Sequence, residues 1–187
     1  MSQTPMPTAT PPRSLRRRWA IIAGIAVAVI AVLAVAYTAF TPSPAPPGAP
    51  GAAPSGFMAT TAAGQSVPVP GGKPSAVLFF SATCGSCGPA AHALAQAQHA
   101  DTHGANTYAV VDMDPSESPQ TIRAFLAANQ ASTLPVASDT NAALTGAYQV
   151  TALSTAVILG PDGRAVARTV EPTDAQIQQQ LTTASTP

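Results

Sequence analysis

Residues 76–89 read AVLFFSATCGSCGP and contain both cysteines of the chain, Cys84 and Cys87. The apolar run 76–80 predicts a buried strand, because a strand with one face in water would alternate apolar and polar residues. Good helix formers make up residues 90–99. The sequence therefore places a pair of thiols between a central strand and a helix.

The spacing of the two cysteines predicts dithiol redox chemistry. Two intervening residues allow a small disulfide ring. A helix that begins at Cys84 would aim its unpaired N–H groups and its positive dipole end at the Cys84 sulfur. A thiolate is stabilised in such a place and is reactive. A metal site and a purely structural pair are the alternatives for this motif.

A zinc site is the more specific of these alternatives. Cys84, Cys87, His99 and His103 nearly match the spacing of a two-Cys, two-His site. On one continuous helix from Cys84, however, His99 would lie about 22 Å along the axis, whereas zinc bonds are about 2 Å long. We therefore expect no zinc site formed by these four residues.

The N-terminal residues predict a membrane anchor. Residues 1–18 form a basic arm with four arginines, and residues 19–40 form a charge-free run rich in Ala, Val and Ile. At about 1.5 Å per residue the run reaches roughly 33 Å, close to the hydrocarbon thickness of a bilayer. The arginines favour a cytoplasmic N-terminus and a domain that faces the periplasm or the cell exterior. A signal peptide cleaved after Ala36 is the alternative.

Residues 41–56 are rich in Pro, Ala, Gly and Ser and carry no charge, which predicts a semi-stiff linker. Residues 57–187 are enough for one domain. From Thr41 onward the chain has four basic and eight acidic residues, a net charge of −4. Nucleic-acid-binding domains are typically basic, so we expect no nucleic acid as partner.

The patterns of residues 57–187 predict an α/β domain whose central mixed sheet carries helices on both faces. The cysteines would lie at the carboxyl end of a central strand, where reactive groups commonly occur. The expected elements are a hairpin over 57–69, strands at 76–81 and 107–113, helices at 90–99 and 119–128, an extended piece at 134–136, a helix capped by Asp139 that runs to Tyr148, strands at 155–159 and 165–170, and a helix at 173–181.

This order of elements resembles the thioredoxin fold, in particular the membrane-anchored TlpA-like and ResA-like branch of the AhpC/TSA-redoxin type. The resemblance covers residues 57–183. It implies a three-layer sandwich, a redox disulfide between Cys84 and Cys87, and disulfide exchange with protein partners outside the cytoplasm. The residues that carry it are the entry hairpin, the run 79–89, Leu134-Pro135-Val136, Tyr148-Gln149-Val150 and the turn 160–163.

The chain departs from the pattern of that family at the site. Thr83 stands where the family usually has Trp. Leu153-Ser154-Thr155 stands where the family usually has Thr-Pro-Thr, whose cis proline helps to dock an extended substrate strand. A cis bond before a non-proline residue costs roughly 2.5–4 kcal/mol, so we expect a trans bond before Ser154 and a locally different docking loop. The usual places of a buried acid hold Leu78 and Ala90.

Other polar residues are expected to have structural roles. We expect His92 to be a packed or solvated helical residue rather than a proton acceptor. Asp112 and Asp114 flank Met113 at a strand end. Alternation would point both the same way only into solvent or a loop, which predicts strand-exit and capping residues.

The sequence thus predicts a membrane-anchored thiol:disulfide oxidoreductase, in which Cys84 attacks and Cys87 resolves the mixed disulfide. It would act as a monomer on protein thiols and disulfides. No nucleotide, flavin or metal is required, since electrons move through dithiols. A Cu(I)-binding chaperone on the two soft thiolates and a non-catalytic binding module remain the alternatives.

Overall fold

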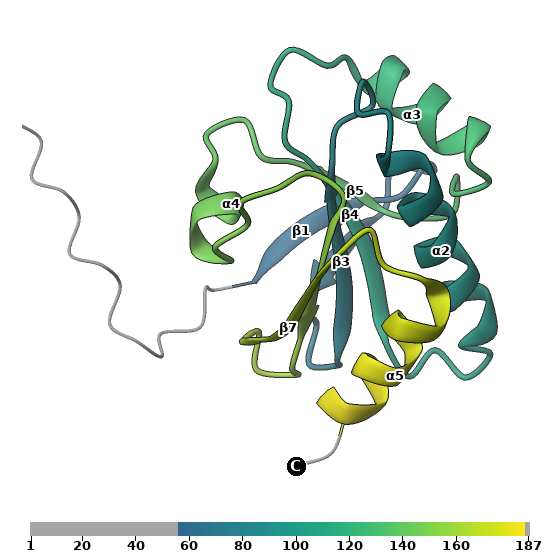
Figure 1. The fold of residues 1–187 in the computed structure, drawn as a ribbon, viewed down its shortest axis with the longest axis vertical. Helices are drawn as coiled ribbons and strands as arrows, with labels where there is room; N and C mark the ends of the chain where they lie inside the picture. The colour runs from purple at the N-terminus through teal and green to yellow at the C-terminus, as the bar shows by residue number, and fades with distance from the viewer. Residues whose placement is uncertain (1–55, 186–187) are drawn as a thin grey trace, which may run out of the picture. The chain divides into compact units, whose positions relative to one another are not determined.

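The computed structural model describes residues 56–185, in which a seven-stranded mixed sheet carries helices on both faces (Figure 1). The predicted arm, anchor and linker lie outside these residues, apart from Gly56. Within the described residues, no helix is both long and apolar enough to cross a membrane. The elements are β1 (Phe57–Thr60), β2 (Ser66–Val69), β3 (Ser75–Phe80), α2 (Cys87–Ala100), β4 (Thr107–Asp112), α3 (Pro119–Ala128), β5 (Val136–Ser138), α4 (Ala143–Ala147), β6 (Thr155–Leu159), β7 (Ala165–Val170) and α5 (Asp174–Ala184).

The strand order in the sheet is β2-β1-β5-β4-β3-β6-β7, which places β3 between two neighbours. β3 runs parallel to β4, with Phe80 opposite Asp112, and antiparallel to β6. All six residues of β3 are buried. Its continuous apolar run is therefore explained by cover on both faces, as predicted.

Two apolar cores lie on opposite faces of this sheet. Leu78 and Phe80 of β3 belong to the core that α2, α3 and α5 cover, and Phe80 stacks on Phe125 of α3 with ring centroids 5.2 Å apart. Phe79 belongs to the other core, where it meets Tyr148 edge to face at 6.1 Å. Figure 1 shows α4 on the opposite side of the sheet from α2, α3 and α5. Alternation along one buried strand thus supplies both cores.

Asp139 caps α4 as predicted, but the helix begins only at Ala143, and Ala142 occupies the N-cap position with a φ of 55°. The Asp139 carboxylate accepts the backbone N–H groups of Leu144 and Thr145, at 2.9 and 2.7 Å, and the Thr145 hydroxyl at 2.6 Å. Burial opposes ionisation of Asp139, but these hydrogen bonds bring its pKa below the ordinary value. A buried carboxylate therefore fixes the start of this five-residue helix.

Candidate active site

Cys84 and Cys87 are joined by a disulfide, with their Cα atoms 5.4 Å apart. Cys87 is the first residue of α2 and is fully buried, whereas Cys84 lies ahead of the helix and is half-buried. A partner sulfur therefore has access to Cys84 and is kept from Cys87. This asymmetry suits an attacking and a resolving thiol.

The prediction that the helix begins at Cys84 is wrong, because α2 begins at Cys87. Cys84 lies instead in two successive turns. Its N–H donates to the Ser81 carbonyl at 3.1 Å, and its carbonyl accepts the Cys87 N–H at 3.3 Å. Ser86 occupies the N-cap without capping α2 through its side chain, and its hydroxyl oxygen lies 3.7 Å from the Cys84 sulfur. The first turn of α2 thus begins beside the disulfide rather than at the attacking sulfur.

The loop 153–155, which stands where the family usually has a proline, contacts the dithiol motif through a hydroxyl group. Val69-Pro70 is the cis peptide bond of the described residues, so the bond before Ser154 is trans, as expected. Ser154 is only 1% exposed and has a φ of 60°, and its hydroxyl donates to the Ser86 carbonyl at 3.4 Å. Leu153 beside it is 40% exposed. The loop therefore still reaches the disulfide motif, but with a left-handed serine in place of a proline ring.

Glu117 is a site residue that the sequence analysis missed. It lies in the loop between β4 and α3 and reaches residues 81–83, here called the pre-cysteine loop. Its carboxylate accepts the Ser81 hydroxyl at 2.7 Å, the Ala82 N–H at 2.8 Å and the Thr83 N–H at 3.1 Å. The one available signal was its position after the carboxyl end of a strand parallel and adjacent to β3.

Asp112 is the strand-exit residue that the sequence analysis expects, and its carboxylate accepts the N–H of Asp114 in the following loop at 3.1 Å, but its burial was not foreseen. It is the last residue of β4 and is only 2% exposed. Burial raises the pKa of Asp112 to about 6, and the Glu117 carboxyl, with which it shares a hydrogen bond, adds to this increase. Asp114 behaves as expected, since its carboxylate accepts the N–H and the hydroxyl of Ser116 at 2.9 and 2.6 Å.

The histidines stay apart from the thiols. His92 lies in α2 with Nδ1 3.2 Å from the Asn129 carbonyl oxygen and Nε2 2.8 Å from the Gln96 amide nitrogen, which confirms a packed helical residue. Within residues 56–185, no three His, Cys, Asp or Glu side chains are placed to hold a metal ion. His99 and His103 therefore do not join the cysteines in a zinc site.

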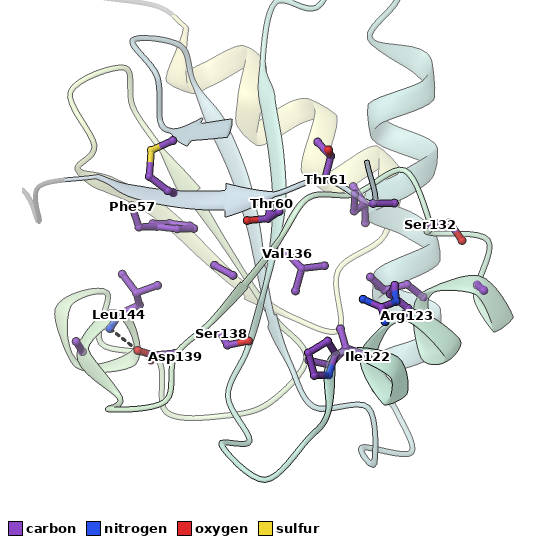
Figure 2. A pocket seen from close by; sticks show the side chains of 18 of the residues that line it. Phe57, Thr60, Thr61, Ile122, Arg123, Ser132, Val136, Ser138, Asp139 and Leu144 are labelled. Carbon is purple, nitrogen blue, oxygen red and sulfur yellow. Dashed lines mark hydrogen bonds between the residues drawn. The ribbon is translucent and has the colours of Figure 1, made fainter. Parts of the chain in front are cut away.

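A separate cavity of about 730 Å³ lies between β1, α3, β5 and α4 (Figure 2). Phe57, Ile122, Val136 and Leu144 supply much of its apolar lining, and Arg123 adds a cation. β1 pairs with β5 only through Thr60 and Val136, so the two strands leave room between them. Neither the cysteines nor residues 153–155 line this cavity, which is therefore distinct from the dithiol site.

The fold and the disulfide define the class of the protein, a thioredoxin-like oxidoreductase. The chain belongs to the AhpC/TSA family, which it matches over residues 51–168. It is also 46% identical over 115 residues to a Streptomyces lividans protein described as mercury resistance operon ORF3. That match covers 60% of this chain and 61% of the relative's length.

Solved structures support the fold. StoA from Bacillus subtilis is 22% identical with a TM-score of 0.59, over 69% of this chain and 98% of StoA. A secreted Mycobacterium tuberculosis disulfide oxidoreductase homologous to E. coli DsbE is 19% identical with a TM-score of 0.54, over 68% and 95% of the two chains. A putative thiol:disulfide interchange protein DsbE from Chlorobium tepidum is 22% identical with a TM-score of 0.58, over 71% and 94%.

Proposed function

We propose that this protein exchanges disulfides with protein partners outside the cytoplasm. The observation that carries the proposal is the unequal exposure of the bonded pair, with Cys84 half-buried and Cys87 fully buried. Disulfide exchange needs one sulfur that a partner reaches and a second that attacks from within the site. Family membership and fold support the same chemistry.

In the reducing direction, the Cys84 thiolate attacks a partner disulfide. A bond forms between Cys84 and one partner sulfur, and the other partner sulfur leaves as a thiolate. The Cys87 thiolate then attacks the Cys84 sulfur, which restores the intramolecular disulfide and releases the second partner thiolate. Two electrons pass to the partner, and the two protons of the dithiol are released. The oxidising direction is the reverse, with the same bonds formed and broken.

The proposed location is the outer side of a membrane, with residues 19–40 as anchor and the N-terminus in the cytoplasm. The arginine-flanked apolar run supports this orientation. A Pro- and Ala-rich linker would hold the domain away from the bilayer. One structural neighbour is described as a secreted disulfide oxidoreductase.

We propose the loop 153–155 as the contact for partner polypeptides. Leu153 exposes an apolar side chain next to Ser154, whose hydroxyl binds the Ser86 carbonyl within the motif. An exposed apolar side chain beside a reactive sulfur favours an extended apolar partner segment. Leu153 would then supply an apolar contact surface in place of the tryptophan that the family usually has at the position of Thr83.

The test is redox equilibration of the purified full-length chain in detergent micelles, in buffers of reduced and oxidised glutathione. A single two-electron transition of the Cys84–Cys87 pair is expected, and its potential sets the direction of electron flow. Cys87→Ser is expected to accumulate mixed disulfides with partners, whereas Cys84→Ser is not. Absence of a reversible transition would refute the proposal.

A second candidate function is the binding of a soft metal ion by the reduced dithiol. The relative described as mercury resistance operon ORF3 favours this candidate, and paired thiolates are soft ligands. Titration of the reduced chain with Hg(II) or Cu(I), followed by sulfur-to-metal charge-transfer absorbance, tests it. Stoichiometric binding that is lost in both Cys84→Ser and Cys87→Ser would support it, and equal binding by these variants would refute it.

A further inference from the structure

Two carboxyl groups meet next to the dithiol motif although the redox reaction as described uses neither. Asp112 ends β4 directly opposite Phe80, the last residue of β3. Paired residues of parallel strands point to the same face, so the Asp112 side chain lies on the side of Phe80 and Cys87. Asp112 is 2% exposed and shares a hydrogen bond with Glu117. This pair therefore lies where β3 passes into the pre-cysteine loop.

Glu117 holds the pre-cysteine loop by three hydrogen bonds, to the Ser81 hydroxyl and to the N–H groups of Ala82 and Thr83. The loop is closed on its other side by the bond from the Cys84 N–H to the Ser81 carbonyl. The position of Cys84 thus depends on a turn whose two N–H groups are bound by one carboxylate. Two of these three donors are backbone groups, so substitutions at Ala82 or Thr83 would leave them in place.

We propose that Asp112 and Glu117 form an acid pair that positions Cys84 through the pre-cysteine loop and makes its redox equilibrium depend on the proton that the pair shares. This inference rests on the proposed disulfide exchange and adds a regulatory element to the same site. Asp112 and Glu117 are positioning residues, because they act on Cys84 through the loop.

The surroundings of Asp112 contain further acids. Asp114 of the same loop raises the pKa of Asp112 by its charge, after burial and Glu117, although its backbone N–H opposes the increase. Asp139, at the end of β5, donates its N–H to the Asp112 carbonyl at 2.8 Å, while its carboxylate binds α4. No Lys, Arg or His of the described residues is among the groups that shift Asp112. When the disulfide is reduced, the thiols of Cys84 and Cys87 become further titratable groups in these surroundings.

Cations on the neighbouring helices are engaged elsewhere. His92 of α2 binds Asn129 and Gln96, and Arg123 of α3 lines the separate cavity. Asp112 therefore loses its proton with no cation among the groups that shift its pKa. Above about pH 6 Asp112 carries a negative charge beside the turn that holds Cys84, and well below that pH it is neutral.

A negative charge disfavours a thiolate nearby. Reduction of the disulfide takes up two electrons and two protons, and any thiolate fraction of the product is stabilised when the pair carries less charge. Neutral Asp112 therefore favours the reduced protein relative to charged Asp112. The redox equilibrium between this protein and glutathione then depends on pH more strongly than the titration of the thiols alone would make it.

The test compares Asp112→Asn and Glu117→Gln with the wild-type full-length chain in detergent micelles, equilibrated with glutathione at about pH 5 and about pH 7.5. At the higher pH both variants are expected to shift the equilibrium constant toward the reduced protein by about three- to tenfold. At the lower pH Asp112→Asn is expected to match the wild type, because Asp112 is then already neutral. Asp162→Asn, in the turn after β6 at the opposite edge of the sheet, is the matched control and is expected to stay close to the wild type.

A second readout addresses the positioning role. Hydrogen exchange of the peptide that contains Ala82 and Thr83 is expected to accelerate at least about tenfold in Glu117→Ala, and less in Glu117→Gln, whose amide oxygen still accepts one N–H. Unchanged exchange in Glu117→Ala would refute the clamp.

The outcomes separate this inference from the proposed function. If the wild type has no reversible disulfide, disulfide exchange fails, whereas the exchange of the pre-cysteine loop still decides whether Glu117 clamps it. If the wild type is redox-active but Asp112→Asn shifts the equilibrium equally at both pH values, or at neither, the proton-sharing role is refuted while disulfide exchange stands.

Discussion

The hydroxyl of Ser154 donates a hydrogen bond to the carbonyl of Ser86, at 3.4 Å. This bond joins the loop before β6 to the dithiol motif, where the family resemblance implied a cis proline. Ser154 makes the contact with a φ of 60°, in the left-handed region that few residues other than glycine and asparagine favour. The loop of this chain therefore contacts the motif through a serine hydroxyl on a left-handed backbone.

A proline at position 154 is expected to destabilise the protein. Proline fixes φ near about −65°, which is incompatible with the observed Ser154 backbone. Ser154→Pro should lower the free energy of unfolding by more than about 1 kcal/mol in urea titrations. Ser154→Ala is the control, because it removes only the hydroxyl. Equal stability of the two variants would contradict this account of the loop.

Much of the fold could be predicted from local patterns. Short stretches of sequence were enough to predict the apolar run of β3, the turn 160–163 between β6 and β7, and the capping role of Asp139. The strand-exit role of Asp112 was predicted, but its burial was not, because β4 is covered on both faces up to its last residue. Burial at a strand end depends on the loops that fold over it, and no local pattern reports that.

The contacts of Glu117 could not be predicted from the spacing of residues in the sequence. Its partners are Ser81, Ala82 and Thr83, which lie 34 to 36 positions earlier in the chain. They meet because β3 and β4 are parallel neighbours, so the loops after the two strands share one edge of the sheet. The start of α2 was missed for a related reason, since this distant carboxylate binds the turn of residues 81–84 that precedes the helix.

Asp112→Asn is expected to stabilise the protein at neutral pH. The pKa of Asp112 lies above its ordinary value, so the folded state keeps this proton to higher pH than the unfolded state does. Its stabilising contribution is complete below about pH 4 and is lost as the pH rises through about 6, which amounts to on the order of 3 kcal/mol. Thermal unfolding between about pH 4 and about pH 7.5 measures it.

In that experiment the amide side chain of the variant has no proton to lose, so the variant should show a flatter profile than the wild type over this range. The amide oxygen can still accept the Asp114 N–H that the Asp112 carboxylate accepts at 3.1 Å. Parallel profiles for variant and wild type would show that Asp112 titrates alike in the folded and unfolded states.

Asp139→Ala is expected to destabilise the protein by about 1–2 kcal/mol, because it removes the cap that binds two N–H groups of α4. The pKa of Asp139 is lowered, so its contribution is present at neutral pH and is lost as the pH falls below about 4. Chemical unfolding at neutral pH measures the loss. Asp162→Asn, in an exposed turn, is the control and should change stability by less than about 0.5 kcal/mol.

Leu153→Ser is expected to impair exchange with protein substrates while leaving exchange with small thiols intact. Leu153 is 40% exposed beside Ser154, so a polypeptide bound at Cys84 would cover it, whereas glutathione reacts with the sulfur alone. Loss of this apolar contact should lower kcat/KM for insulin reduction about three- to tenfold, since burying such a side chain contributes roughly 1 kcal/mol or more. The rate with glutathione should be unchanged, and Val166→Ser, at an exposed position on β7, should behave like the wild type in both assays. If Leu153→Ser slows both substrates equally, the loop supports the disulfide itself rather than the docking of partners.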